Sequence, residues 1–149
     1  MRFWIRTRRR VAEQRARGII DTSVVIDLEL IDARELPKEL AVSAITLAEL
    51  AAGPHATMDA AERGRRQDRL QRAESTFDPI PFDTAAARAY GRIYAAVTAS
   101  GRTARRRRAI DLLIAATALA EGLPLYTCNA DDFGHLDGLL DIVAVAASV

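Results

Sequence analysis

The chain has 149 residues and a formal net charge of +1; half of its residues are hydrophobic and only 5% are aromatic. This length fits one domain with a buried core, and the low aromatic content argues against an all-β sandwich. A single cysteine, Cys128, excludes an intrachain disulfide. Without a membrane-length apolar run or a signal-peptide core, we expect a cytoplasmic protein that does not contact membranes.

Positive charge is concentrated at the start of the chain. Residues 1–17 carry seven arginines and one glutamate. We expect this basic N-terminal extension to lie outside the fold, which then comprises residues 18–149. A disordered extension or a misassigned start is favoured over a basic arm that contacts phosphates, and the composition also suits an organellar transit peptide.

A buried strand that stops at a carboxylate opens the expected fold. Residues 18–26 read GIIDTSVVI, in which an apolar run is followed by Asp21, Thr22 and Ser23. Asp21 is expected at the carboxyl end of the strand, the edge of an open α/β sheet where ligands bind. Because these three residue types also cap helices, this stretch alone does not distinguish a functional site from a helix cap.

The rest of the chain alternates between helical and strand patterns. These patterns predict helices over residues 24–31, 44–52, 57–74 and 109–120, a long helix after the cap Asp83-Thr84, strands over 40–43, 123–127 and 139–145, and at most an edge strand over 80–82. Such alternation specifies an α/β fold. We expect one central parallel sheet of four to five strands flanked by helices.

Acidic residues occur inside apolar helices and after strands. Glu49 and Asp111 lie in apolar helices, whereas Asp131 and Asp132 follow a strand, as Asp21 does. Taken alone, Glu49 is better explained by an exposed helical turn. Burying an unpaired Asp111 would cost several kcal/mol, so it requires either a cation or a place at the mouth of a site in the first turn.

Carboxylates that converge at one sheet edge repel one another and need a compensating cation. Oxygen ligands select Mg²⁺ or Mn²⁺ over Zn²⁺, and neither His55 nor His135 lies in a zinc-like spacing. Such an ion lowers the pKa of a water molecule and neutralises charge on a phosphate, which is nuclease chemistry. Five arginines before the last apolar helix would hold a polyanion, or form a solvated face: Arg102, Arg105, Arg106, Arg107 and Arg108.

Four segments in this order, IIDTSVVI, ITLAEL, RAIDLLIAATAL and TCNADDF, resemble a PIN-domain nuclease. The short single domain resembles the VapC-type toxins of bacterial toxin-antitoxin pairs, and the resemblance covers residues 18–145. By position it implies four catalytic, metal-binding acids: Asp21, Glu49, Asp111 and Asp132, with Asp131 as the alternative to Asp132. It also implies that Thr22 or Ser23, together with Asn129, orients waters and carboxylates.

The resemblance further implies an endoribonuclease toxin that hydrolyses RNA with one or two Mg²⁺ or Mn²⁺ ions. It implies a homodimer and a cognate antitoxin whose peptide binds across the helices beside the site. Two other functions stay open, a Mg²⁺-dependent phosphoaspartyl enzyme or receiver that uses Asp21, and a non-catalytic RNA-binding regulatory module. Ser23, where a haloacid-dehalogenase-like enzyme needs an Asp, and Lys38 as the only lysine argue against the first. The presence of all four acids argues against the second.

Overall fold

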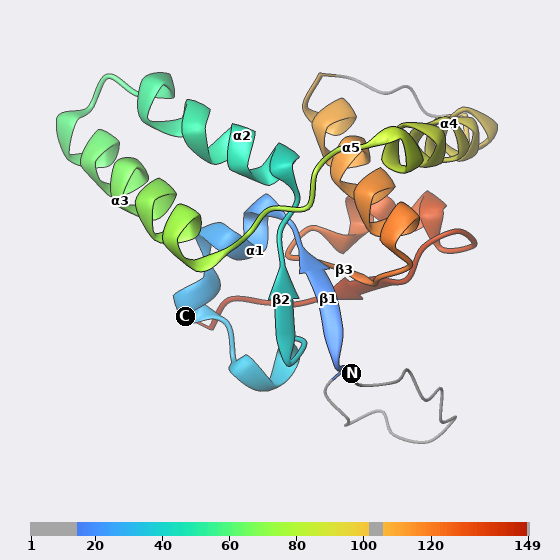
Figure 1. Cartoon of the computed structure of the whole chain (residues 1–149), viewed down its shortest axis with the longest axis horizontal. Coiled ribbons are helices and arrows are strands. Elements are labelled where there is room, and N and C mark those ends of the chain that lie inside the picture. The colour runs from blue at the N-terminus through green and yellow to red at the C-terminus, as the bar shows by residue number, and fades with distance from the viewer. Residues whose placement is uncertain (1–14, 102–105, 149) are drawn as a thin grey trace.

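The computed structural model describes residues 15–101 and 106–148 (Figure 1). Its strands are β1 (Arg17–Ile20), β2 (Glu39–Ala41), β3 (Leu125–Thr127) and β4 (Ile142–Ala144). Its α-helices are α1 (Thr22–Ile26), α2 (Ala44–Ala52), α3 (Ala60–Thr76), α4 (Thr84–Ala99) and α5 (Arg106–Glu121). Short 3₁₀ helices cover Leu28–Leu30, Ala33–Glu35, Gly53–Ala56 and Ala130–Leu136. The expected α/β architecture is confirmed.

The four strands form one parallel sheet in the order β2-β1-β3-β4. In the register of the sheet, Ile19 of β1 lies between Ala41 of β2 and Leu125 of β3. The expected edge strand over residues 80–82 is reduced to a single bridge between Ile80 and Ser43. Because all four strands run in the same direction, their carboxyl ends meet at one edge, which faces the region between α2 and α5 (Figure 1).

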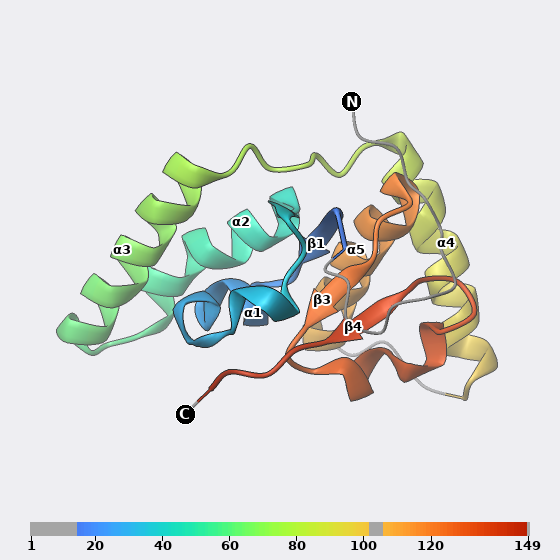
Figure 2. The ribbon, with the colours of Figure 1, turned by 90° about the horizontal axis from the view of Figure 1, so that it is seen from below.

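Each face of the sheet has its own hydrophobic core, because successive side chains of a strand point to opposite sides. Ile19 and Leu125 pack with α4 and α5. Ile20 and Tyr126 pack with α1, α2 and α3. Figure 2 shows these two sets of helices on opposite sides of the strands. The sheet is therefore covered on both faces, as parallel sheets generally are.

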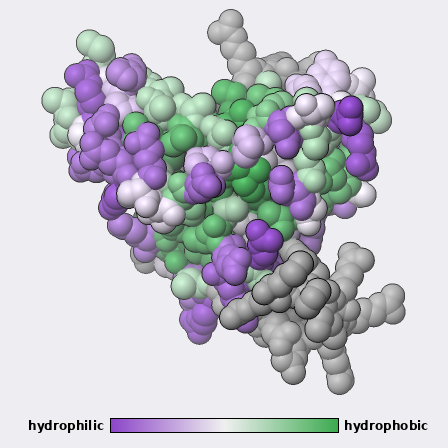
Figure 3. Space-filling model, in the orientation of Figure 1, coloured by the Kyte–Doolittle hydropathy of each residue, from purple (hydrophilic) through white to green (hydrophobic). Residues whose placement is uncertain are grey.

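The helix α5 is the buried centre of the molecule, as its apolar sequence predicts. Leu112 and residues 114–118 are buried in the core that α5 shares with α4. Gly122, whose φ of 65° suits glycine, lies directly beyond the helix and ends it. By contrast, α3 is exposed along most of its length, and Figure 3 shows a hydrophilic surface over the arm that it forms.

The fold begins earlier than the expected boundary at residue 18. The carbonyl groups of Arg15 and Ala16 accept hydrogen bonds from Lys38 N and Glu39 N at 2.8 and 2.9 Å, which continues the pairing of β1 with β2. The Arg15 guanidinium also pairs with Asp141. At least residues 15–17 are thus part of the fold, since backbone pairing does not depend on their basic side chains; residues 1–14 lie outside the described part.

The first helix also differs from expectation. It starts at Thr22 rather than residue 24, because Asp21 caps it directly, and it ends at Ile26. A separate 3₁₀ helix, Leu28–Leu30, covers most of the remaining expected stretch. Within the described residues, none of the helices combines the length and the apolar character needed to cross a membrane.

Candidate active site

Asp21 occupies the position that the sequence predicts, directly after β1, and it is only 4% exposed. Its Oδ1 accepts hydrogen bonds from Val24 N at 3.1 Å and from Ser23 Oγ at 2.5 Å. Asp21 therefore caps α1 and also places its carboxylate at the carboxyl edge of the sheet, where ligands bind in open α/β folds. None of the described residues donates a hydrogen bond to Oδ2, so this oxygen keeps its capacity to bind a cation.

Glu49 is joined to the same turn of α1 by a hydroxyl group. Thr22 Oγ1 lies 2.5 Å from Glu49 Oε1 and 3.2 Å from Thr46 Oγ1. Both Thr46 and Glu49 lie on α2, three residues apart and on one side of the helix. The half-buried Glu49 is thus not merely a solvated turn: its carboxylate contacts the residue that follows Asp21.

Ser23 connects the ends of the two central strands. Its Oγ donates to Asp21 Oδ1 and accepts from Cys128 N at 3.1 Å, directly beyond β3. Burial raises the pKa of the Cys128 thiol, while a hydrogen bond with Ser23 acts in the opposite direction. Burial thus disfavours the thiolate, which is the form in which cysteine binds metals.

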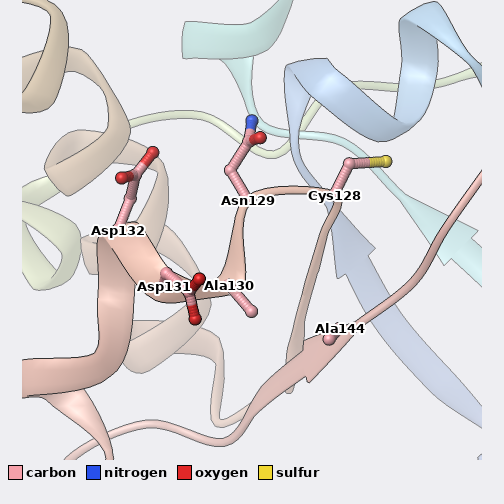
Figure 4. A pocket seen from close by; sticks show the side chains of 6 residues that line it. All are labelled: Cys128, Asn129, Ala130, Asp131, Asp132 and Ala144. Atoms are coloured by element: carbon pink, nitrogen blue, oxygen red, sulfur yellow. The ribbon is translucent and has the colours of Figure 1, made fainter.

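A pocket of about 390 Å³ opens beyond β3 and β4 (Figure 4). It is lined by Cys128, Asn129, Ala130, Asp131, Asp132 and Ala144. In Figure 4 the side chains of Asn129 and Asp132 point to the same side, whereas that of Asp131 points away from it. This divergence favours Asp132 over Asp131 as the acid that faces the site.

Asp111 lies in the second turn of α5 and is half-buried. The helix begins at Arg106, three residues before the expected start, so Asp111 is not in its first turn. Of the five arginines of the basic run, Arg102 and Arg105 lie outside the described residues, and only the half-buried Arg108 has a described side chain.

The structure brings together only part of the predicted site. Asp21 and Glu49 are connected through neighbouring hydroxyls, and Ser23 connects Asp21 to the pocket that Asp132 lines. Across residues 15–101 and 106–148, no three His, Cys, Asp or Glu side chains lie close enough to hold one ion together. The donor chemistry fits Mg²⁺ or Mn²⁺, since the predicted ligands offer carboxylate oxygens. Convergence of all four acids on one ion stays a prediction.

Sequence reasoning did not single out Thr46 as part of the site. The available signal was its spacing: it is the one polar residue besides Glu49 in an otherwise apolar helix, three residues earlier. That spacing places both on one side of α2, but it does not indicate the contact with Thr22.

Comparison with known proteins identifies the fold. Residues 18–139 match the family model described as PIN domain. Ribonuclease VapC5 of Mycobacterium tuberculosis is 39% identical over 132 residues, which cover 85% of this chain and 93% of that protein. Ribonuclease VapC8 of the same organism is 40% identical over 102 residues, covering 68% of this chain and 89% of that protein.

A solved structure agrees with these matches. The crystal structure of VapBC-5, a toxin-antitoxin system of Mycobacterium tuberculosis, contains a chain with a TM-score of 0.77 and 36% identity. The match covers 87% of this chain and 99% of that one. The range matched by the family model, residues 18–139, spans the positions of Asp21, Glu49, Asp111 and Asp132. This chain therefore belongs to the PIN-domain family.

Proposed function

We propose that this chain is a metal-dependent endoribonuclease and the toxin of a toxin-antitoxin pair. Two relatives at 39% and 40% identity carry the name ribonuclease. A matched solved structure is of a toxin-antitoxin system. The observation that carries the proposal is the arrangement at the end of β1, where buried Asp21 and half-buried Glu49 are held by hydroxyl groups at the ligand edge of a parallel sheet.

We assign the metal-binding role to Asp21, Glu49, Asp111 and Asp132. A bound Mg²⁺ or Mn²⁺ would supply an activated water and neutralise charge on the scissile phosphate. The chain's own contribution is orientation: Ser23 Oγ and Val24 N fix one oxygen of Asp21, and Thr22 holds one oxygen of Glu49. These contacts leave the second oxygen of each carboxylate available for a metal ion. Because the side chains of Asp21 and Glu49 are already held, they lose less rotamer freedom when the ion binds.

The proposed partners are an RNA substrate, a cognate antitoxin and a second copy of this chain. Arginines at the start of α5 and before it, Arg102 and Arg105–Arg108, are proposed to contact RNA phosphates, because a polyanion gains affinity from such charges. Membership in the PIN-domain family favours this proposal over a phosphoaspartyl enzyme or receiver.

The direct test is cleavage of a cellular RNA pool by the purified, antitoxin-free full chain. We expect discrete products with Mn²⁺ and none with EDTA. Asp111→Asn should lower the cleavage rate by at least about 100-fold, as expected for loss of a charged ligand. Asp68→Asn, which neutralises an exposed acid on α3, is the matched control and should cleave normally.

Thermal melting separates a ligand from a structural carboxylate. Mn²⁺ should raise the Tm of the wild-type chain, because a ligand of the folded state stabilises it. In EDTA, Asp111→Asn should melt at the same or a higher temperature, because one like charge has been removed. Unfolding of this variant would indicate a structural role for Asp111. A well-folded wild-type chain that shows neither cleavage nor a Mn²⁺ shift would support a non-catalytic RNA-binding module instead.

A further inference from the structure

Thr46 carries a hydroxyl group that is fully buried, with 0% of the residue exposed. A buried hydroxyl without a partner is costly, so its contacts indicate its role. The backbone N of Thr46 donates to Ser43 Oγ at 3.1 Å, which fixes the residue at the start of α2. Its side-chain Oγ1 lies 3.2 Å from Thr22 Oγ1.

The directions of the hydrogen bonds follow from the number of protons. Thr22 has one hydroxyl proton, and its Oγ1 contacts both Glu49 and Thr46. A carboxylate can only accept, and the 2.5 Å contact is the shorter one, so the Thr22 proton goes to Glu49 Oε1. The Thr46 hydroxyl must then donate to Thr22, which gives a chain of donors from Thr46 through Thr22 to Glu49.

The usual alternative for a helical threonine is a bond to the carbonyl four residues earlier. Thr117 on α5 makes this bond, with its Oγ1 3.1 Å from Leu113 O. At Thr46 the corresponding carbonyl belongs to Val42, and it accepts from Ile80 N at 2.9 Å. The Thr46 hydroxyl contacts Thr22 instead, although Thr46 and Thr117 are both buried helical residues.

We infer that Thr46 is a positioning residue that orients Glu49 for cation binding through the hydroxyl of Thr22. This inference rests on the proposed function. A free glutamate side chain loses rotamer freedom when it binds an ion. Because the buried Thr46 is hydrogen-bonded to Thr22, and Thr22 is hydrogen-bonded to Glu49 Oε1, part of that freedom is already lost before binding. Thr46 touches neither substrate nor ion, so its effect should be on metal affinity.

Calorimetric titration of the full chain with Mn²⁺ tests this role without any measurement of activity. Thr46→Val keeps the shape of the side chain and removes the hydroxyl. We expect it to weaken Mn²⁺ binding about tenfold, the lower end of the range for residues that orient metal ligands. Thr46→Ser, which retains a hydroxyl, should recover most of the affinity.

Thr117→Val is the matched control, because it also removes a buried hydroxyl from a helix. The Thr117 hydroxyl, however, is bonded to Leu113 O within α5 and not to a residue of the site. It should change Mn²⁺ affinity by less than about twofold, a value typical of a site without contact to the acids. Melting in EDTA checks that each variant folds, so a loss of affinity in a folded protein cannot be ascribed to unfolding.

A double substitution tests whether Thr46 acts through Thr22. If it does, adding Thr46→Val to Thr22→Val should weaken Mn²⁺ binding no further than Thr22→Val alone. Equal effects of Thr46→Val and Thr117→Val, or additive effects of Thr22→Val and Thr46→Val, would overturn the inference while leaving the proposed function intact. A wild-type chain that binds no Mn²⁺ would overturn the proposed function and this inference with it.

Discussion

The two halves of the candidate site differ in how far the protein fixes their geometry. In the half formed by α1 and α2, Asp21 is 4% exposed and hydrogen-bonded, and Glu49 is held by Thr22. In the half beyond β3, Asn129 and Asp132 are exposed beside a pocket. Neither of their side chains forms a hydrogen bond with a described residue. Hydrogen bonds therefore hold the acids of the first half, whereas the side chains of Asn129 and Asp132 have no such contact with described residues.

This difference bears on the charge repulsion that is expected if the predicted acids converge on one ion. Carboxylates held close together repel one another, and the repulsion grows as they are buried. Of the four predicted acids, hydroxyl donors hold Asp21 and Glu49, whereas Asp132 is exposed to solvent, where water screens its charge. Ser23 is the contact between the two halves, since it touches both Asp21 and Cys128.

The largest effect on RNA cleavage is expected in the half beyond β3. Asp132→Asn should lower RNA cleavage by at least about 100-fold if this acid faces the ion. Because Asp132 is exposed, the free energy of unfolding should change by less than about 0.5 kcal/mol. The adjacent Asp131→Asn is the control and should cleave within about threefold of wild type, since a side chain pointing away has no ligand to lose. The opposite ranking in a cleavage assay would assign the role to Asp131.

An intermediate effect on RNA cleavage is expected at Ser23, which contacts both halves of the site. Ser23→Ala removes the donor to Asp21 and leaves Cys128 N without its acceptor, which should destabilise the fold by about 1–3 kcal/mol. Cleavage should fall roughly tenfold, because Asp21 loses one of its two orienting contacts. Urea denaturation and cleavage rates measure both changes, with the exposed Ser75→Ala as control. Unchanged stability would mean that the halves are not coupled through Ser23.

The smallest effect concerns the reactivity of Cys128. Burial raises the pKa of its thiol, so the thiolate is scarcer in the folded chain than in the unfolded one at a given pH. Alkylation by iodoacetamide at pH 8, followed by mass spectrometry, should be several-fold slower in the folded chain than in urea. The rate should rise with pH through and above the ordinary thiol pKa. Equal rates in the two states would mean that burial does not protect the Cys128 thiol.

The sequence predicts those features that depend on local pattern. Apolar periodicity and the Gly53-Pro54 stop predict α2 with the bounds that the structure shows, Ala44–Ala52. Strand patterns followed by acids predict that Asp21 and Asp132 lie beyond the carboxyl ends of neighbouring strands. These predictions succeed because hydrophobic burial and helix capping act over a few residues.

Features that depend on three-dimensional contacts could not be predicted. Composition suggested that the fold starts at residue 18, but the backbone of Arg15 and Ala16 pairs with β2 regardless of their side chains. Pattern places Thr22 and Thr46 near the same sheet edge, yet their 3.2 Å contact depends on how α1 and α2 pack. The orientations of Asp131 and Asp132 depend on the turn of the 3₁₀ helix that carries both.

The bond between Ser23 and Cys128 joins residues that are 105 positions apart in the chain. During synthesis at roughly 5–20 residues per second, Ser23 therefore leaves the ribosome about 5–20 seconds before its partner. The strand pair β1 and β3 has the same long separation, and such contacts form late because a long loop must close first. A nascent chain thus carries Asp21 and Glu49 for seconds before the sheet edge that completes the site exists. Assembly of the site is a late event in the life of each new molecule, coupled to the completion of the chain itself.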